Sequence, residues 1–285
     1  DIELTPDGTI LAIAMEDING FKPDLVLEIA PEGESQANLL WSWRVYDHMG
    51  SWNDPYKFYD DANYHQVDWN HFNAIHLNNE GEIYLSSRNW GEIYIISWGE
   101  NNDLLYRWGN PQNYGINEEQ KLFSPHGVNE ILEGYPGEGN FIIFNNNNIQ
   151  GQSNNYSLIM ELSPPRLDDG SYFLEQGEAF GPETVVWLYQ DTFFSSRQGG
   201  AFRLPNGNTF VTVTTDHYLF EVTHNGDVVW EHFINVARSQ KYRLDYLSLT
   251  GDLNNDGTTN ILDAVLLINL VMNDDYNSTS DINND

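Results

Sequence analysis

The sequence predicts an all-β protein: a β-propeller of four-stranded blades, followed by a small α-helical module with a calcium loop. A unit of β-branched strands and Asn-Gly, Asp-Gly or Glu-Gly turns recurs four times, and each copy closes on a Trp. The chain has 285 residues with nine Trp, 16 Tyr and 23 Gly, a balance typical of a turn-rich β-fold. Before residue 260 no long stretch has the apolar period of a helix.

Each unit reads as a turn, two strands and a closing strand, in the order "TPDGTILAIA", "DLVLEIAPEG", "LLWSW" for the first copy. The other three copies begin at "LNNEGEIYLSSR", "GEGNFIIFNNNN" and "LPNGNTFVTVTT". We expect the closing aromatics to occupy equivalent places: Trp43, Trp108, Trp187 and Trp230. A β-sandwich would not explain why a Trp-closed unit recurs. A closed ring of about six blades would require blades outside this chain.

The segment "DLNNDGTTNILD" at 252–263 has the ligand spacing of an EF-hand loop, with Gly257 at its sharp turn. An apolar helical face follows in "ILDAVLLINLVM", which favours a calcium site over an Asn/Asp-rich surface turn. The expected Ca²⁺ ligands are Asp252, Asn254, Asp256, the Thr258 carbonyl, Asn260 and Asp263.

A loop with one following helix and Asp in the last position resembles a type I dockerin repeat. The sequence ends on "DINND" at 281–285, which repeats "DLNND" at 252–256 except for one residue. We therefore expect a second repeat that is either cut off or completed by oxygen ligands from another molecule. We therefore divide the chain into a propeller at 1–246 and a dockerin-like module at 247–285. The resemblance implies a cohesin-like partner. Without a second helix, we expect the apolar face with Leu262, Val265, Leu266 and Val271 to be covered by the propeller or by a neighbouring molecule.

Acidic residues outnumber basic ones 43 to 12, and the formal net charge is −31. Nucleic acid is therefore an improbable partner, because a polyanion would be repelled. The absence of Cys excludes disulfides and thiolate chemistry, and no apolar run reaches membrane-spanning length. The acidity and the start at Asp1 without Met favour a processed, secreted protein, either extracellular, at the cell surface or periplasmic, or a fragment.

The order of "TPDGTILAI", "WSWRVYDH", "DWNHFNAI", "LLYRWGNPQNYG", "KLFSPHGV", "RLPNGNTF" and "EVTHNGDVVWEH" resembles the aryl-sulfate sulfotransferase propellers over nearly all of residues 1–246. The resemblance implies sulfuryl transfer from a phenolic sulfate ester to a phenol through a histidine, without a nucleotide donor. The sequence also contains no phosphate-binding Gly-Lys loop. Such chemistry requires a neutral imidazole and groups that hold the sulfuryl oxygens.

The resemblance implies His71 and His126 as catalytic residues, and Arg88 is a candidate anion-binding residue. Three features depart from the family pattern. Pro125 replaces a Gln, the run "FNNNNIQGQSNN" contains no arginine where the family has one, and Arg197 and Gln198 stand where another histidine is expected. The remaining histidines (His48, His65, His76, His217, His224 and His232) are expected to be structural.

The first function hypothesis is therefore a secreted arylsulfotransferase-like enzyme, with part of the family's catalytic set missing or displaced. The alternative is a non-catalytic extracellular propeller that acts in calcium-dependent binding or self-assembly into a filament. The missing arginine and the calcium module favour this alternative. A carbohydrate-binding propeller is a weaker reading, because most of the aromatic surplus is explained by the blade-closing Trp residues.

Overall fold

The computed structural model of the protein describes residues 1–33, 35–59, 68–147 and 156–241, and residues 253, 261–263, 265–266 and 268 of the C-terminal part. The chain forms two compact units, Asp1–Ser239 and Gln240–Asp285. The boundary predicted at residue 246 lies outside the described residues. Among the described helices, none has the length and apolar character needed to cross a membrane.

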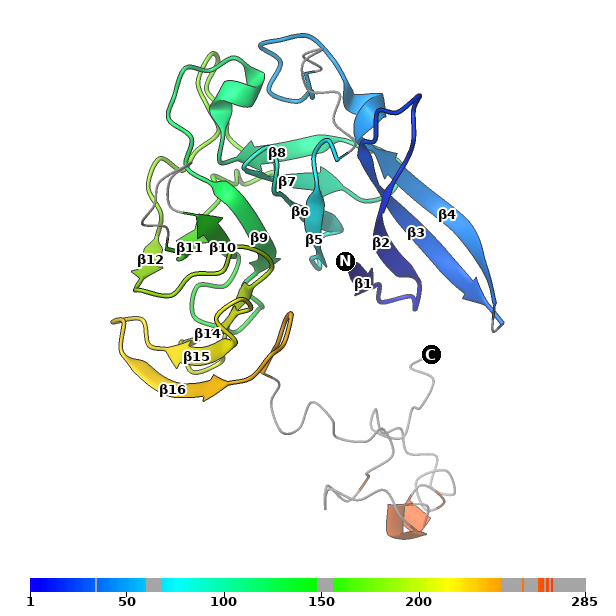
Figure 1. Ribbon diagram of the computed structural model, residues 1–285. Coiled ribbons are helices and arrows are strands. Elements are labelled where there is room, and N and C mark those ends of the chain that lie inside the picture. The colour runs from blue at the N-terminus through cyan, green and yellow to red at the C-terminus, as the bar shows by residue number, and fades with distance from the viewer. Residues whose placement is uncertain are drawn as a thin grey trace. The chain divides into compact units, whose positions relative to one another are not determined.

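The described part of the first unit contains four antiparallel four-stranded sheets, and each sheet is formed by four consecutive strands. This confirms the predicted propeller blades (Figure 1). Blade 1 consists of β1 (Ile2–Leu4), β2 (Ile10–Met15), β3 (Asp24–Glu32) and β4 (Gln36–Arg44). Blade 2 consists of β5 (Phe72–Leu77), β6 (Glu82–Ser87), β7 (Glu92–Ser97) and β8 (Leu104–Trp108).

Blade 3 consists of β9 (Phe123–Glu130), β10 (Phe141–Asn147), β11 (Leu158–Leu162) and β12 (Trp187–Gln190). Blade 4 consists of β13 (Gly200–Arg203), β14 (Thr209–Val213), β15 (Tyr218–Val222) and β16 (Val228–Phe233). Two short 3₁₀ helices, η1 (Val45–His48) and η2 (Pro111–Tyr114), follow the last strands of blades 1 and 2.

The sequence units are offset by one strand from the blades. Each predicted unit began at a hairpin turn, whereas the first strand of every blade precedes that turn. The turn glycine has a left-handed backbone in all four blades, which explains why the Asn/Asp-Gly and Glu-Gly pairs recur there. These glycines are Gly8, Gly81, Gly139 and Gly207, with φ of 78°, 78°, 78° and 85°. The four closing Trp residues lie on the fourth strands, as predicted.

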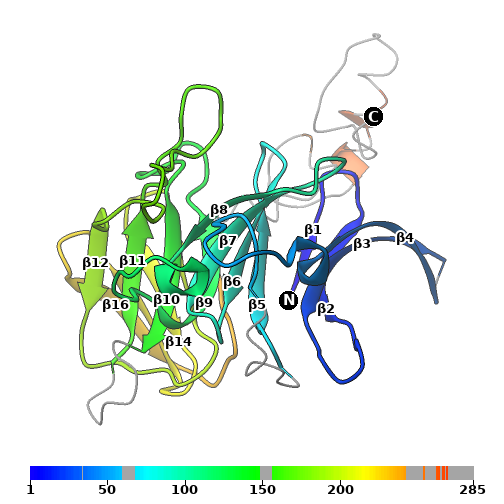
Figure 2. The same ribbon diagram turned by 90° about the horizontal axis from the view of Figure 1, so that it is seen from above.

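The blades follow one another in an arc, with their first strands towards its inside (Figures 1 and 2). β5 contacts β1 and β9, and β9 contacts β13. Three apolar clusters fill the spaces between neighbouring blades, centred on Trp43 and Tyr94, on Trp108 and Phe141, and on Phe144 with its neighbours in blade 4. These interblade cores hold the ends of the first strands in fixed relative positions.

Buried ion pairs add directional constraints to these cores. The guanidinium of Arg107 is fully buried and donates to Glu92 Oε1 and Oε2 at 2.9 and 2.6 Å. Arg203 on β13 pairs with Glu161 on β11, so this contact joins blade 4 to blade 3. A buried charge is expensive to leave unpaired, so the Arg107–Glu92 pair constrains β7 against β8 within blade 2, and the Arg203–Glu161 pair constrains blade 4 against blade 3.

In the second unit the described residues include helical positions 261–263, 265–266 and 268. Asp263 is 2% exposed, and its Oδ1 accepts a hydrogen bond of 2.9 Å from the Leu253 backbone N–H. The apolar residues described here are exposed: Ile261, Leu262, Val265, Leu266 and Ile268. The predicted apolar face thus includes three of the four residues named from the sequence, and Val271 lies outside the described residues.

Candidate functional site

A cavity of about 490 Å³ opens beside the starts of the first strands of blades 2, 3 and 4. All three predicted catalytic residues, His71, His126 and Arg88, line it. His71 immediately precedes β5, Arg88 immediately follows β6, and His126 lies on β9. The other lining residues are Asn73, Asn146, Ser196, Arg197 and Gln198. The fold thus brings together side chains from three blades.

His126 has the geometry of a neutral nucleophile. Its Nδ1 lies 3.0 Å from the Gly199 carbonyl oxygen. Because a carbonyl only accepts, Nδ1 carries the hydrogen, and Nε2 keeps a lone pair in the neutral ring. Burial lowers the pKa of His126 to about 4, and the positive charge of Arg238 adds a smaller effect. The imidazole is therefore unprotonated at neutral pH.

His71 is paired with a carboxylate. Its Nδ1 lies 2.6 Å from Asp68 Oδ2, and both side chains are partly exposed. The bond fixes Nδ1–H towards Asp68, so Nε2 is the nitrogen available to a ligand. The backbone of His71 is left-handed, with φ of 52°. The next residue is anchored as well, because Phe72 N–H donates to the buried Asp24 carboxylate at 2.5 Å. Burial raises the pKa of Asp24 to about 6.

Within the described residues, neither of the two arginines of the cavity has a carboxylate partner. Among the seven described arginines, the other five contact a carboxylate of the described residues: Arg44, Arg107, Arg166, Arg203 and Arg238. Arg88 donates to the Asn89 side chain at 2.9 Å, and Arg197 has no side-chain partner within the described part of the chain. In a protein with a net charge of −31, two such guanidinium groups on one cavity indicate an anion site.

Asparagine side chains hold this arrangement together. Asn73 donates to the Pro125 carbonyl at 2.9 Å and so links β5 to β9 beside His126. Asn146, in the asparagine run that follows Phe144, donates to the carbonyls of Ser195 and Gln198 at 2.8 Å each. These two carbonyls bracket Arg197, so Asn146 positions the loop that carries its guanidinium.

Sequence reasoning assigned no role to Asp68, Asn146 or Arg197. The motif "DWNHFN" contains Asp68, but only the structure shows its contact with His71. Arg197 was recognised only as a departure from the family pattern, because a lack of ion pairing has no sequence signature. His76 lies on β5 outside the cavity, and burial lowers its pKa to about 4, as suits the structural role expected for it.

The predicted calcium ligands Asp252, Asn254, Asp256, Thr258 and Asn260 lie outside the described residues. The sixth, Asp263, is described, and its buried carboxylate is directed towards the start of the loop. That orientation fits a twelfth-position ligand, since the loop must bring its last carboxylate back to its first residues. Within the described residues, no cluster of three His, Cys, Asp or Glu side chains could hold a metal ion.

The cavity therefore combines a neutral imidazole, a carboxylate-paired imidazole and two guanidinium groups. Imidazole Nε2 can attack an electrophilic centre, while guanidinium groups stabilise the oxygens of an anion undergoing transfer. The second imidazole can move a proton to or from a phenolic oxygen.

Comparison with known proteins finds one family that matches more than half of the chain. The family model "Arylsulfotransferase (ASST)" matches residues 1–166. The chain is similar to the β-propeller domain of Cps50 (Swd1) from Myceliophteria thermophila, with 12% identity, a TM-score of 0.47, and coverage of 81% of this chain and 58% of that one. It is also similar to a streptogramin B lyase, with 11% identity, a TM-score of 0.42, and coverage of 81% and 53%.

Virginiamycin B lyase from Staphylococcus aureus is a further similar structure, with 12% identity, a TM-score of 0.40, and coverage of 82% of this chain and 54% of that one. The chain thus spans between half and three-fifths of the length of these three structures. No curated protein matches it.

Proposed function

Because the chain belongs to the arylsulfotransferase family, we propose that its central cavity transfers a sulfuryl group from a phenolic sulfate ester to a phenol. The observation that carries the proposal is the convergence on one cavity of a neutral imidazole and two arginines that have no carboxylate partner among the described residues, in a protein of strongly negative charge. An anionic ligand would otherwise be repelled.

In the first half-reaction, His126 Nε2 attacks the sulfur, the N–S bond forms and the S–O bond to the aryl group breaks. The leaving phenolate takes a proton from Nε2 of His71, whose charge is stabilised by Asp68. Arg88 and Arg197 hold the sulfuryl oxygens while charge moves to the phenolate. In the second half, an acceptor phenol returns its proton to His71, its oxygen bonds to sulfur, and the N–S bond breaks.

Turnover of 4-nitrophenyl sulfate with phenol as acceptor tests the proposal directly. We expect release of 4-nitrophenolate without any nucleotide, with ping-pong kinetics. His126→Asn keeps an N–H for Gly199 but lacks a nucleophile, so it should reduce transfer by at least about a hundredfold. His232→Asn on the exposed face of β16 is the matched control. Lack of turnover with a range of phenols, or undiminished transfer by His126→Asn, would reject the proposed reaction.

A second proposed function concerns the C-terminal unit, where Ile261, Leu262, Val265, Leu266 and Ile268 are exposed and the Asp263 carboxylate accepts a hydrogen bond from the Leu253 backbone N–H. Calcium bound there would hold the loop and helix together and present the apolar face to a cohesin-like partner or to a second copy of this chain. Both roles suit an extracellular protein. The ligands would be Asp252, Asn254, Asp256, the Thr258 carbonyl, Asn260 and Asp263.

Light scattering with and without a chelator separates these options. Calcium-dependent growth in mass supports self-assembly, since an open head-to-tail contact propagates. A monomer in both conditions, even at high concentration, argues against it.

A further inference from the structure

A second, smaller cavity of about 220 Å³ lies beside the first one on blade 4. The two share Arg197 and Gln198. We infer that this second cavity binds a carboxylate on the phenolic substrate, so that the protein prefers phenols and phenolic sulfates with an acidic substituent. The inference rests on the proposed function and names the substrate class of that site.

The wall of the second cavity comes from three chain segments: the loop before β13, the turn between β14 and β15, and the residues after β16. Hydrogen bonds tie the three segments together. Ile234 N–H donates to the His217 carbonyl at 2.8 Å, and Thr215 N–H donates to the Ser195 hydroxyl of the loop before β13 at 3.2 Å. The cavity is therefore formed by segments already bonded to one another, and a ligand need not assemble it.

The polar groups of this cavity fall into two sets. The hydroxyls of Thr214 and Thr215 already donate to carbonyl oxygens, those of Ala237 and Phe194. Four longer side chains make no hydrogen bond or ion pair with the described residues. They are Arg197, Gln198, His217 and Asn235. All four carry N–H groups that can donate, and Arg197 can only donate.

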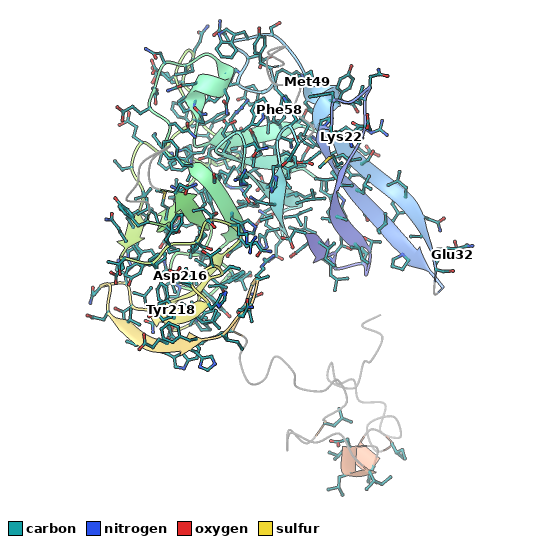
Figure 3. All side chains as sticks on the ribbon, in the orientation of Figure 1. Lys22, Glu32, Met49, Phe58, Asp216 and Tyr218 are labelled. Carbon is teal, nitrogen blue, oxygen red and sulfur yellow. The ribbon has the colours of Figure 1, made fainter. Side chains whose placement is uncertain are left out.

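A carboxylate matches this set better than a neutral or apolar group. Arg binds carboxylates with two parallel hydrogen bonds, and the amides and the imidazole can supply more donors to the same two oxygens. The lining contains no Phe, Tyr, Trp or aliphatic side chain larger than that of Ala237, so an aryl ring would find little apolar surface there. The carboxylate of Asp216, which is labelled in Figure 3, accepts the Phe194 N–H at 3.0 Å. Asp216 is not among the described residues that line the cavity.

Backbone conformation points to the same place. Seven non-glycine residues of the described chain have positive φ, and five of them are Asn or His, residue types that adopt this conformation more often than most. The other two lie at the cavities: Gln198 lines both, and Ser124 lies two residues before His126. Left-handed residues of this kind are strained and cluster at functional sites.

Arg197 lines both cavities. A substrate that occupies both must therefore be long enough to extend past its guanidinium. A sulfuryl group in the first cavity and a carboxylate in the second would lie on either side of this guanidinium. A ring with the two groups at opposite positions, as in 4-hydroxybenzoate and its sulfate ester, spans such a boundary. The neutral analogue 4-hydroxybenzamide has the same shape and lacks only the charge.

Isothermal titration calorimetry of the full chain at low salt, with 4-hydroxybenzoate and 4-hydroxybenzamide, tests the inference without requiring turnover. The acid should bind at least about tenfold more tightly than the amide, and the difference should shrink in high salt, since the groups are partly exposed. Asn235→Ala and His217→Ala change only the second cavity. Each should reduce the preference for the acid several-fold and leave affinity for the amide unchanged.

His232→Ala, on the exposed face of β16, is the matched control and should keep the full preference. Equal affinity for acid and amide in the unaltered protein, or a preference that survives both Asn235→Ala and His217→Ala, would overturn the inference. If the protein transfers sulfate but shows no such preference, only the substrate class is wrong. If it prefers the acid but does not transfer sulfate, the carboxylate site stands and the proposed reaction fails.

Discussion

The buried imidazole of His126 makes a quantitative prediction about stability and pH. Burial lowers its pKa from 6.5 to about 4, so as the pH falls below 6.5 the unfolded chain binds a proton that the folded chain does not. The stability from the neutral imidazole is therefore fully present above pH 6.5 and is lost as the pH falls towards 4. A difference of about 2.5 pH units corresponds to about 3 kcal/mol of unfolding free energy.

The variant His126→Asn isolates this contribution, because an amide can donate to the Gly199 carbonyl but does not titrate. Urea unfolding of both proteins from about pH 7.5 to about pH 4.5 gives the difference in unfolding free energy. Relative to the variant, the unaltered protein should lose about 1.4 kcal/mol per pH unit below about pH 6. His76, with a pKa lowered to about 4, and Asp24, with a pKa raised to about 6, titrate in both proteins and cancel.

The control His232→Asn replaces an imidazole on the exposed face of β16. It shows how much a change from His to Asn alters the unfolding free energy where the imidazole is not buried. Parallel stability curves for the unaltered protein and His126→Asn would refute the reasoning. They would mean that the His126 side chain is hydrated in solution, and its role as a neutral nucleophile over a wide pH range would lose its physical basis.

Three further predictions concern other parts of the chain. Asp68→Asn keeps an acceptor for His71 Nδ1–H but removes the negative charge. We expect kcat to fall at least about tenfold with KM nearly unchanged, and the pH profile of kcat to shift. An unchanged profile would assign Asp68 a purely structural role. Glu92→Gln leaves the buried Arg107 guanidinium without a charged partner and should cost about 3–5 kcal/mol in urea unfolding, whereas a loss below about 1 kcal/mol would mean that the pair is hydrated. Chelation should lower the helicity and protease resistance of residues 240–285 without altering the propeller; identical proteolysis with and without chelator would contradict a calcium loop.

The fold was predictable because its information is local and repeated. Asn/Asp-Gly and Glu-Gly turns and alternating strands are short-range signals, and four copies reinforce one another. The closing Trp residues were correctly placed on the fourth strands. The sequence did not show which strand is the first of each blade. Strands such as β1 (Ile2–Leu4) and β13 (Gly200–Arg203) are short and precede the turn, and their partners are defined only by pairing.

The candidate site was predictable in part. Motif resemblance placed His71 and His126 together, and both line the cavity with Arg88. The resemblance could not supply Arg197, because its importance lies in what it does not contact. Nor could periodicity show that the turn at His217 and the chain after β16 close a second cavity. Both properties depend on which segments of the folded chain meet in space, and no local sequence signal reports that.

The missing arginine of the asparagine run and the presence of Arg197 have one physical explanation. Transfer of a sulfuryl group requires a cation near its oxygens, and the strand that carries this cation is immaterial to the chemistry. In this chain the run supplies Asn146, whose amide donates to the carbonyls on both sides of Arg197. An amide can make these two neutral contacts, whereas a guanidinium in its place would add a third positive charge beside Arg88 and Arg197. In the proposed reaction Arg197 supplies the cation that the asparagine run lacks, and Asn146 of that run positions the loop that carries Arg197.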